Sequence, residues 1–135
     1  MKKGFTLVEL LAVIIILGML VVLLVPNVIS ILKSNNLRVY KLKEKELLRA
    51  AEDYIEYDEE FVAPTNEAPV KYLTIQSLIS KNYINKILDN SSGEECPAFV
   101  KISKDGDNYN LDPCIICGEY KTDRDFCTSS MYQSL

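Results

Sequence analysis

Residues 2–26 read KKGFTLVELLAVIIILGMLVVLLVP, and this stretch decides how the rest of the chain is arranged. From residue 10 to residue 25 it holds no charged and no strongly polar side chain. A helix rises about 1.5 Å per residue, so the apolar run, which continues to Leu32, is long enough to cross a hydrocarbon core roughly 30 Å thick. One acidic residue, Glu9, lies near its start, where a carboxylate is costly in lipid.

The charges around the apolar run indicate how the chain is oriented. Lys2 and Lys3 precede the run, which favours a cytoplasmic N-terminus, a single pass and an exported C-terminal part. Of 15 basic and 19 acidic side chains, 13 and 18 lie from residue 33 onward, a net charge of −5. Nucleic acids bind proteins through phosphate neutralisation, so no direct nucleic-acid binding is expected of this acidic part.

The apolar run is longer than the h-region of a secretory signal, and no A-x-A-like cleavage site follows it. It leads instead into a segment with helical periodicity and a charged opposite face. We expect one helix of about 50 residues from near Phe5 to near Asp58, apolar in its first half and amphipathic in its second. A plain anchor followed by a separate helix is the alternative. The apolar stripe of the second half comprises Leu37, Tyr40, Leu47, Leu48, Ala51, Tyr54 and Ile55.

The first 26 residues resemble the N-terminus of type IV prepilins and their pseudopilin relatives. These share a short basic leader ending in Gly, then Phe, then a Glu five residues after that Gly, then a long apolar helix. The resemblance implies cleavage between Gly4 and Phe5 by a prepilin peptidase, and N-methylation of Phe5. The expected order of elements, a long helix and then a small mixed domain, also resembles that of these proteins. The resemblance therefore implies a pilin-like α+β fold, with the long helix packed against a small antiparallel sheet.

The resemblance also implies roles for three residues inside the apolar run. Glu9 is expected to pair with the free Phe5 amine of a neighbouring subunit during assembly, because an unpaired buried charge is expensive. Gly18 and Pro26 match the helix-breaking residues of many pilins, since Gly lowers helix propensity and Pro removes a backbone donor. The segment between them is expected to be helical or mildly kinked in the isolated subunit, and it could stretch in a filament.

The expected organisation has four parts. These are a leader at 1–4, a transmembrane and polymerisation helix at 5–32, its amphipathic continuation at 33–60, and a small globular region at 61–135. Within the last part, 61–70 has two prolines and is predicted to be a loop, and Thr74 is the expected N-cap of a short helix.

A β-hairpin is predicted over 96–117. Placing Gly106 and Asp107 at the centre of a type II′ turn pairs Asp105 with Asn108 and, counting back, Cys96 with Cys117. A one-residue slip would invert both faces, so the alternation along the strands supports this register. One face is then apolar and is expected to pack on the long helix. It comprises Cys96, Ala98, Val100, Ile102, Tyr109, Leu111, Pro113, Ile115 and Cys117.

Four cysteines in an exported region are typical of disulfides, and they allow three connectivities. The register places Cys96 opposite Cys117 at a non-hydrogen-bonded site, where Cα atoms lie about 4.5 Å apart, within the range of a disulfide. We therefore expect Cys96–Cys117, with Cys114–Cys127 holding the C-terminal tail. A bulge at Pro113 would shift this pairing.

The Cys114-x-x-Cys117 spacing also allows a zinc site or a thiol redox motif. Zinc would need a second knuckle or a histidine, and the chain has neither. A redox motif needs a helix N-terminus after a strand, whereas Gly118 follows here. Catalytic residues, a metal site and cofactors are not expected, and the acidic run at 104–107 lacks the ligand spacing of an EF-hand.

Three functions follow from these patterns. The first is a structural subunit of a type IV pilus-like filament, and the alternative is a pseudopilin of a type II secretion or competence DNA-uptake machine. A membrane-anchored zinc or thiol module is the third. The resemblance implies a non-enzymatic protein whose partners are copies of itself or related pilins, the prepilin peptidase, an inner-membrane assembly platform and, before assembly, membrane lipid. It also implies a cell-surface filament after assembly.

Overall fold

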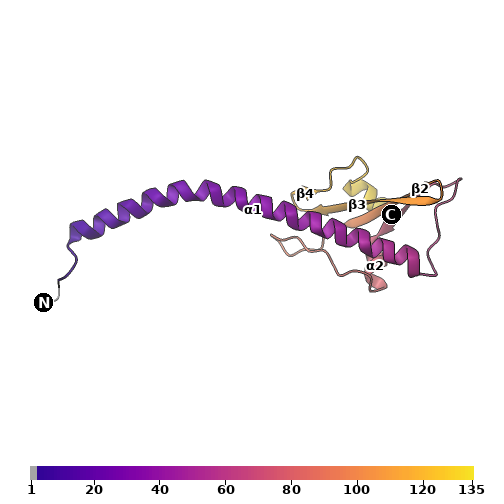
Figure 1. Cartoon of the computed structure of the whole chain (residues 1–135), viewed down its shortest axis with the longest axis horizontal. Helices are drawn as coiled ribbons and strands as arrows, with labels where there is room; N and C mark the ends of the chain where they lie inside the picture. The colour runs from indigo at the N-terminus through magenta and orange to yellow at the C-terminus, as the bar shows by residue number, and fades with distance from the viewer. Residues whose placement is uncertain (1–2) are drawn as a thin grey trace. The chain divides into compact units, whose positions relative to one another are not determined.

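The structure is a computed structural model that describes residues 3–135, so Met1 and Lys2 of the expected leader lie outside the described residues. A long N-terminal helix is followed by a four-stranded antiparallel sheet with two short helices, which confirms the α+β, pilin-like fold class (Figure 1). The elements are α1 (Leu7–Tyr57), β1 (Val70–Thr74), α2 (Ile75–Ser80), β2 (Ala98–Asp105), β3 (Asn108–Cys117), β4 (Tyr120–Lys121) and α3 (Ser129–Ser134).

Helix α1 is a single element of 51 residues, as the continuous-helix prediction required. It begins two residues after Phe5 and ends at Tyr57, one residue before Asp58. The chain divides into two compact units, Met1–Asn36 and Leu37–Leu135, and α1 contributes to both. Each unit is described by itself below.

The sheet of the second unit has the strand order β1-β2-β3-β4, with every neighbouring pair antiparallel. The predicted hairpin register is present, from Asp105 opposite Asn108 to Ala98 opposite Ile115. Gly106 has φ 62°, whereas the only described non-glycine residue with a positive φ is Asn82, which fits the sign pattern of a type II′ turn. Pro113 stays in register opposite Val100 without a bulge. It occupies a site whose backbone nitrogen points away from β2, so no β2–β3 hydrogen bond is lost.

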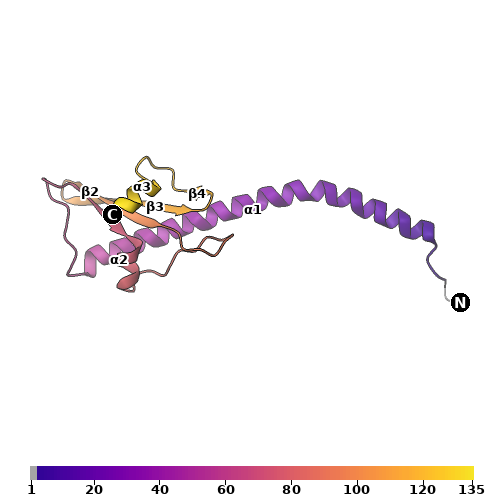
Figure 2. The same ribbon diagram turned by 180° about the vertical axis from the view of Figure 1, so that it is seen from behind.

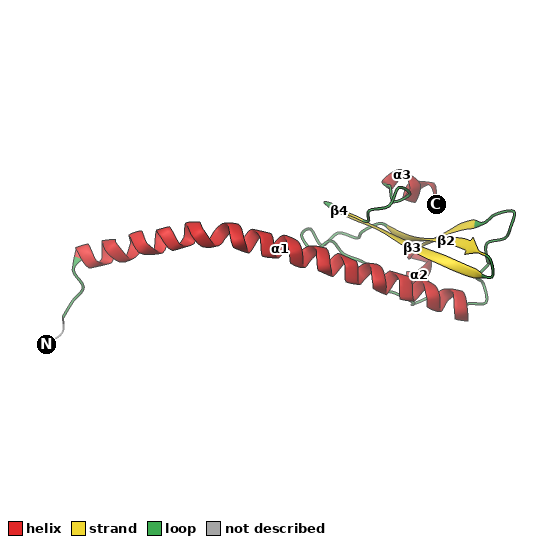
Figure 3. Ribbon diagram, turned by 45° about the horizontal axis from the view of Figure 1, so that its top comes forward, coloured by secondary structure: helices red, strands yellow, loops and turns green. Residues whose placement is uncertain are grey.

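One face of the sheet packs against the amphipathic half of α1, as expected from the alternation (Figure 3). Burying each large aliphatic side chain of this cluster contributes about 1.5–3 kcal/mol. Leu37 was expected on the buried stripe but is 47% exposed, because the sheet covers α1 only from Tyr40 onward. The main members of this core are Tyr40, Leu47, Ala50, Ala51, Leu78, Ala98, Val100, Ile102 and Ile115.

The other face of the sheet is covered by the C-terminal tail, and α3 lies on the side opposite to α1 (Figures 2 and 3). Phe99 is fully buried there, although the next residues on the same face of β2, Lys101 and Ser103, are polar. Phe126 and Tyr132 of the tail lie 6.0 and 6.4 Å from it between ring centroids. The hairpin therefore has two buried patches, one on each face, and the second was not predicted from the sequence.

Candidate functional site: the N-terminal assembly helix and the contacts of the folded unit

The N-terminus of α1 is closed by a reciprocal pair of hydrogen bonds. The backbone N–H of Thr6 donates to Glu9 Oε2 at 3.1 Å, and the backbone N–H of Glu9 donates to Thr6 Oγ1 at 3.3 Å. This is a capping box, in which a Thr and a Glu three residues later satisfy two backbone donors that the first turn leaves unpaired. It explains why the helix begins at Leu7 rather than at Phe5.

Glu9, the expected assembly residue, is exposed in the single chain. Its negative charge lies in the first turn of α1, where the helix dipole favours an anion. A carboxylate has about four acceptor positions, so Glu9 can keep the Thr6 bond and still accept an amine from a second chain. Sequence reasoning missed the capping role, although the spacing of Thr6 and Glu9 is the signal that identifies it.

The expected processing site precedes the helix. Gly4 and Phe5 have no helical or strand assignment, and Phe5 is 85% exposed. Gly4 is exposed as well, and a Cβ placed on it would meet no atom within 4 Å other than those of its chain neighbours. This geometry leaves the bond accessible to a peptidase.

Gly18 and Pro26, the expected helix-breaking residues, both lie inside α1, which stays helical through them. Open space surrounds the Cα of Gly18, and its φ is not in the left-handed region. Pro26 has no N–H, so the helix lacks one of its regular backbone hydrogen bonds at the preceding turn. The two residues weaken this segment of the helix without interrupting it in the single chain.

The apolar segment of α1 is long and apolar enough to cross a membrane, and none of its most hydrophobic window is buried. Every leucine, isoleucine, valine and methionine from Leu7 to Val25 is exposed in the described chain. Soluble proteins rarely expose so large a continuous apolar surface, which marks a membrane or protein contact. The segment therefore needs lipid or other helices around it.

In the folded unit, Glu44 connects α1 to the end of the sheet. Its carboxylate accepts hydrogen bonds from the Tyr120 hydroxyl and, at 2.7 Å, from Thr122 Oγ1. Thr122 Oγ1 in turn accepts from the backbone N–H of Ile115 at 3.0 Å. Burial and the bond to Glu44 raise the pKa of Tyr120, so the phenol keeps the proton that it donates. This network fixes β4 against α1.

Lys43 fixes the connector before the hairpin on the same helix. Its Nζ donates to the Leu88 carbonyl at 2.8 Å and to Asn90 Oδ1 at 3.2 Å. The Tyr40 hydroxyl accepts from the backbone N–H of Asn90 at 3.2 Å, and the Tyr40 ring stacks on Tyr120 with centroids 4.5 Å apart. One turn of α1 thus holds both the connector and the end of the sheet.

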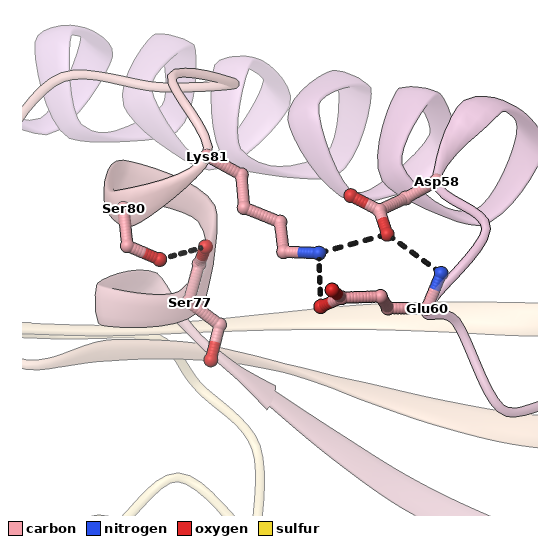
Figure 4. Close-up of polar contacts among 5 residues, drawn as sticks. All are labelled: Asp58, Glu60, Ser77, Ser80 and Lys81. Carbon is pink, nitrogen blue, oxygen red and sulfur yellow. Dashed lines mark hydrogen bonds and ion pairs between the residues drawn. The ribbon is translucent and has the colours of Figure 1, made fainter.

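Lys81, just after α2, bridges two carboxylates that follow α1 (Figure 4). Its Nζ lies 2.9 Å from Asp58 Oδ1 and 2.6 Å from Glu60 Oε2, and 5.5 Å from the centre of the Tyr54 ring. The hydrogen bond from Lys81 holds the pKa of Asp58 below its ordinary value, and the bonds to Glu60 and Asp58 raise the pKa of Lys81. The cluster fastens the end of α1 to α2.

The four cysteines form two disulfides, and these join the pairs that the hairpin register favours. Cys96 and Cys117 have Cα atoms 4.9 Å apart, and Cys114 and Cys127 have Cα atoms 5.3 Å apart. The first lies with the core beside α1, and the second lies with Phe99 on the opposite face. Because all four sulfurs are in disulfides, none is a thiolate that could bind zinc or act as a nucleophile in this state.

In a comparison with known families, the prokaryotic N-terminal methylation motif matches residues 1–25. No curated protein and no solved structure matches the chain. The matched residues include Gly4, Phe5 and Glu9, together with the first part of the exposed apolar segment. The motif points to a structural protein, and with the apolar helix it supports anchoring in the inner membrane and assembly with other pilins. The chain therefore carries the N-terminal methylation motif that is the signature of type IV pilins and their precursors.

Proposed function

We propose that this protein is the structural subunit of a type IV pilus-like filament. The observation that carries the proposal is the methylation motif over residues 1–25, followed in one unbroken helix by an exposed apolar segment. The prepilin peptidase hydrolyses the accessible Gly4–Phe5 bond on the cytoplasmic side, and the new Phe5 amino group is methylated. Cleavage before the apolar run leaves the helix on the mature subunit, first as a membrane anchor and then as a polymerisation helix.

Assembly brings the Phe5 amine of one subunit to Glu9 of its neighbour. Glu9 is suited to this because it is exposed and its carboxylate has acceptor capacity beyond the bond to Thr6. Once the apolar helices surround the pair, loss of either charge leaves the other buried and unpaired, which costs about 3–5 kcal/mol. An inner-membrane platform would extract the subunit from lipid as this pair forms.

The test is electron microscopy of sheared surface filaments from cells that express the full chain. Glu9→Val and Glu9→Gln are both expected to lower filament mass by at least about a hundredfold, because each removes the charge. Glu9→Gln is the sharper variant, since a glutamine at this position still closes the capping box. Glu67→Val, which removes an exposed carboxylate outside α1, is the matched control and should assemble normally.

Equal membrane levels of all variants, measured by immunoblot, would show that insertion is unaffected. Normal filaments in Glu9→Gln would mean that the cap, and not the charge, is what assembly needs. The pseudopilin alternative predicts a different outcome for the whole gene: its deletion would abolish secretion or DNA uptake while wild-type cells carry no surface filament of this subunit.

A further inference from the structure

Six charged residues form one exposed line along the folded half of α1, called here the charge stripe. They are spaced three or four residues apart, so they share a face of the helix. The first four are basic and the last two are acidic, so the stripe changes sign along its length. Its members are Arg38, Lys41, Lys45, Arg49, Glu52 and Glu56.

Within the described residues, no member of the stripe has an ion-pair partner. Among residues 3–135, the salt bridges join Lys81 to Asp58 and Glu60, Lys86 to Glu95, and Arg124 to Asp112, and none includes a member of the stripe. Side-chain hydrogen bonds to the six are also absent from the described chain. Their charged groups are therefore free to meet another molecule.

Neighbouring members of the stripe mostly have the same charge. Lys41 and Lys45, Lys45 and Arg49, and Glu52 and Glu56 are like-charged neighbours at i and i+4. Such pairs destabilise a helix by a few tenths of a kcal/mol, whereas alternating signs would stabilise it. Arg49 is the exception at the boundary between the two blocks, since it lies three or four residues from Glu46, Glu52 and Asp53. Segregated charges of this kind suit an external partner that has the opposite order.

We propose that the partner is a second copy of this chain, displaced along the helix axis. Consider two parallel copies of α1 that lie with their stripes side by side. If one copy is displaced along the helix axis by a whole number of turns, its stripe still faces the stripe of the other copy. Displacements of zero to three turns bring basic residues level with basic residues, such as Arg38 with Arg49 at three turns. Four turns, about 22 Å, is the first that brings only opposite charges of the stripe together. Arg38 then lies level with Glu52, and Lys41 with Glu56.

An anionic lipid surface is the competing partner, because the basic residues follow the apolar segment. It would explain the basic block and leave the acidic block without a role. A copy of the chain uses both blocks, and a filament subunit always has such copies beside it. The inference rests on the proposed function and adds to it an interface on α1 that is separate from Glu9.

The test is a charge swap in the full chain, measured as sheared filament mass. Arg38→Glu with Lys41→Glu, and separately Glu52→Lys with Glu56→Lys, should each lower filament mass at least about fivefold, because like charges then face each other at every contact. The four changes combined should restore it to within about twofold of wild type, as a double-mutant cycle for direct pairing requires. Intact disulfides on non-reducing gels and equal membrane levels should accompany every variant.

The matched control combines Arg38→Glu and Lys41→Glu with Glu67→Lys and Glu119→Lys, two exposed acids outside α1. This control has the same net charge as the variant that combines all four changes in the stripe, but its filament mass should stay as low as that of Arg38→Glu with Lys41→Glu alone. If the variant with all four changes has a filament mass as low as that of Arg38→Glu with Lys41→Glu alone, the inference is wrong and the basic block binds lipid instead. If wild type and both reversals assemble alike, the inference is wrong while the proposed function stands. A wild type without filaments would overturn the proposed function and this interface with it.

Discussion

Glu9 illustrates how much a single carboxylate can do in this chain. In the sequence it is an isolated charge in an apolar run, and in the structure it closes the first turn of α1 together with Thr6. The capping box keeps the chain non-helical up to Thr6, so the Phe5 amine produced by cleavage would lie one residue before the cap. Glu9, which is proposed to pair with the Phe5 amine of a neighbouring subunit, thus also positions the Phe5 amine of its own chain.

Gly118 is the second residue whose identity the structure explains. It has φ 54°, and a Cβ on it would lie 2.5 Å from Asp89 Oδ2. Gly93 has φ 73° but open space around it. Gly93→Ala should therefore cost only the left-handed conformation, about 1–2 kcal/mol. Gly118→Ala should cost about 1 kcal/mol more, because Asp89 must move away from its bonds to Ser91. Denaturant unfolding of both variants in detergent would measure the difference; equal costs would contradict the contact.

The Lys81 cluster predicts a specific dependence of stability on pH. The folded pKa of Asp58 is lowered from 3.8, so its contribution is present above that pH and is lost as the pH falls through the lower folded value. The pKa of Lys81 is raised above 10.5, so its contribution is present below that pH and is lost only in stronger alkali.

The difference in melting temperature between wild type and Lys81→Met should therefore be constant from about pH 5 to 9 and should shrink below about pH 4. Lys86→Met is the control, since its pair with Glu95 is on the surface and its removal should change little. A difference that grows as the pH falls would contradict the cluster.

At the scale of elements, the sequence predicted what depends on local periodicity. The long helix was expected from near Phe5 to near Asp58 and spans Leu7–Tyr57. The hairpin register followed from Gly106 at the turn and from a two-residue alternation that a slip would invert. Both signals lie within the element they describe, which is why they could be read without the rest of the chain.

The elements that were missed depend on partners far away in the sequence. Strand β1 has five residues without clear alternation and exists through its pairing with β2. The burial of Phe99 could not be predicted locally, because its cover, Phe126 and Tyr132, comes from the tail. No local pattern singled out Glu44, because its partners Tyr120 and Thr122 lie beyond the hairpin. Local patterns cannot specify such contacts.

The two disulfides should stabilise different parts of the protein, Cys114–Cys127 the C-terminal tail and Cys96–Cys117 the core beside α1. Replacing Cys114 and Cys127 by Ser should cost about 3 kcal/mol and release the tail from Phe99, so limited proteolysis should cut within residues 122–135. Replacing Cys96 and Cys117 by Ser should cost a similar amount but leave the tail protected in the folded protein. Mass spectrometry under non-reducing conditions should first find both bonds in the wild type. Identical proteolysis of the two double variants would contradict this division.

At the scale of the whole molecule, the two units of the chain are stabilised in different ways, one by its own core and the other by its surroundings. The unit Leu37–Leu135 buries its own core and has two disulfides. In the other unit, Met1–Asn36, the apolar segment of α1 buries none of its most hydrophobic window and depends on its surroundings. A filament built from such subunits would exchange lipid for neighbouring helices around one unit while the other stays folded. Variants of the folded core should therefore lower protein levels, and variants of the first unit should lower assembly alone.

The two covers of the sheet have a consequence for how the protein is made. One cover, α1, is translated first, whereas the other, residues 126–132, is translated after all four strands. Phe99 therefore lacks this cover until residues 126–132 have been translated and, in the proposed topology, an oxidant outside the membrane can close Cys114 to Cys127. If the ribosome stops before residue 126, this face of the sheet stays open. In the proposed topology, proteases outside the membrane would then degrade the anchored chain before it reaches a growing fibre.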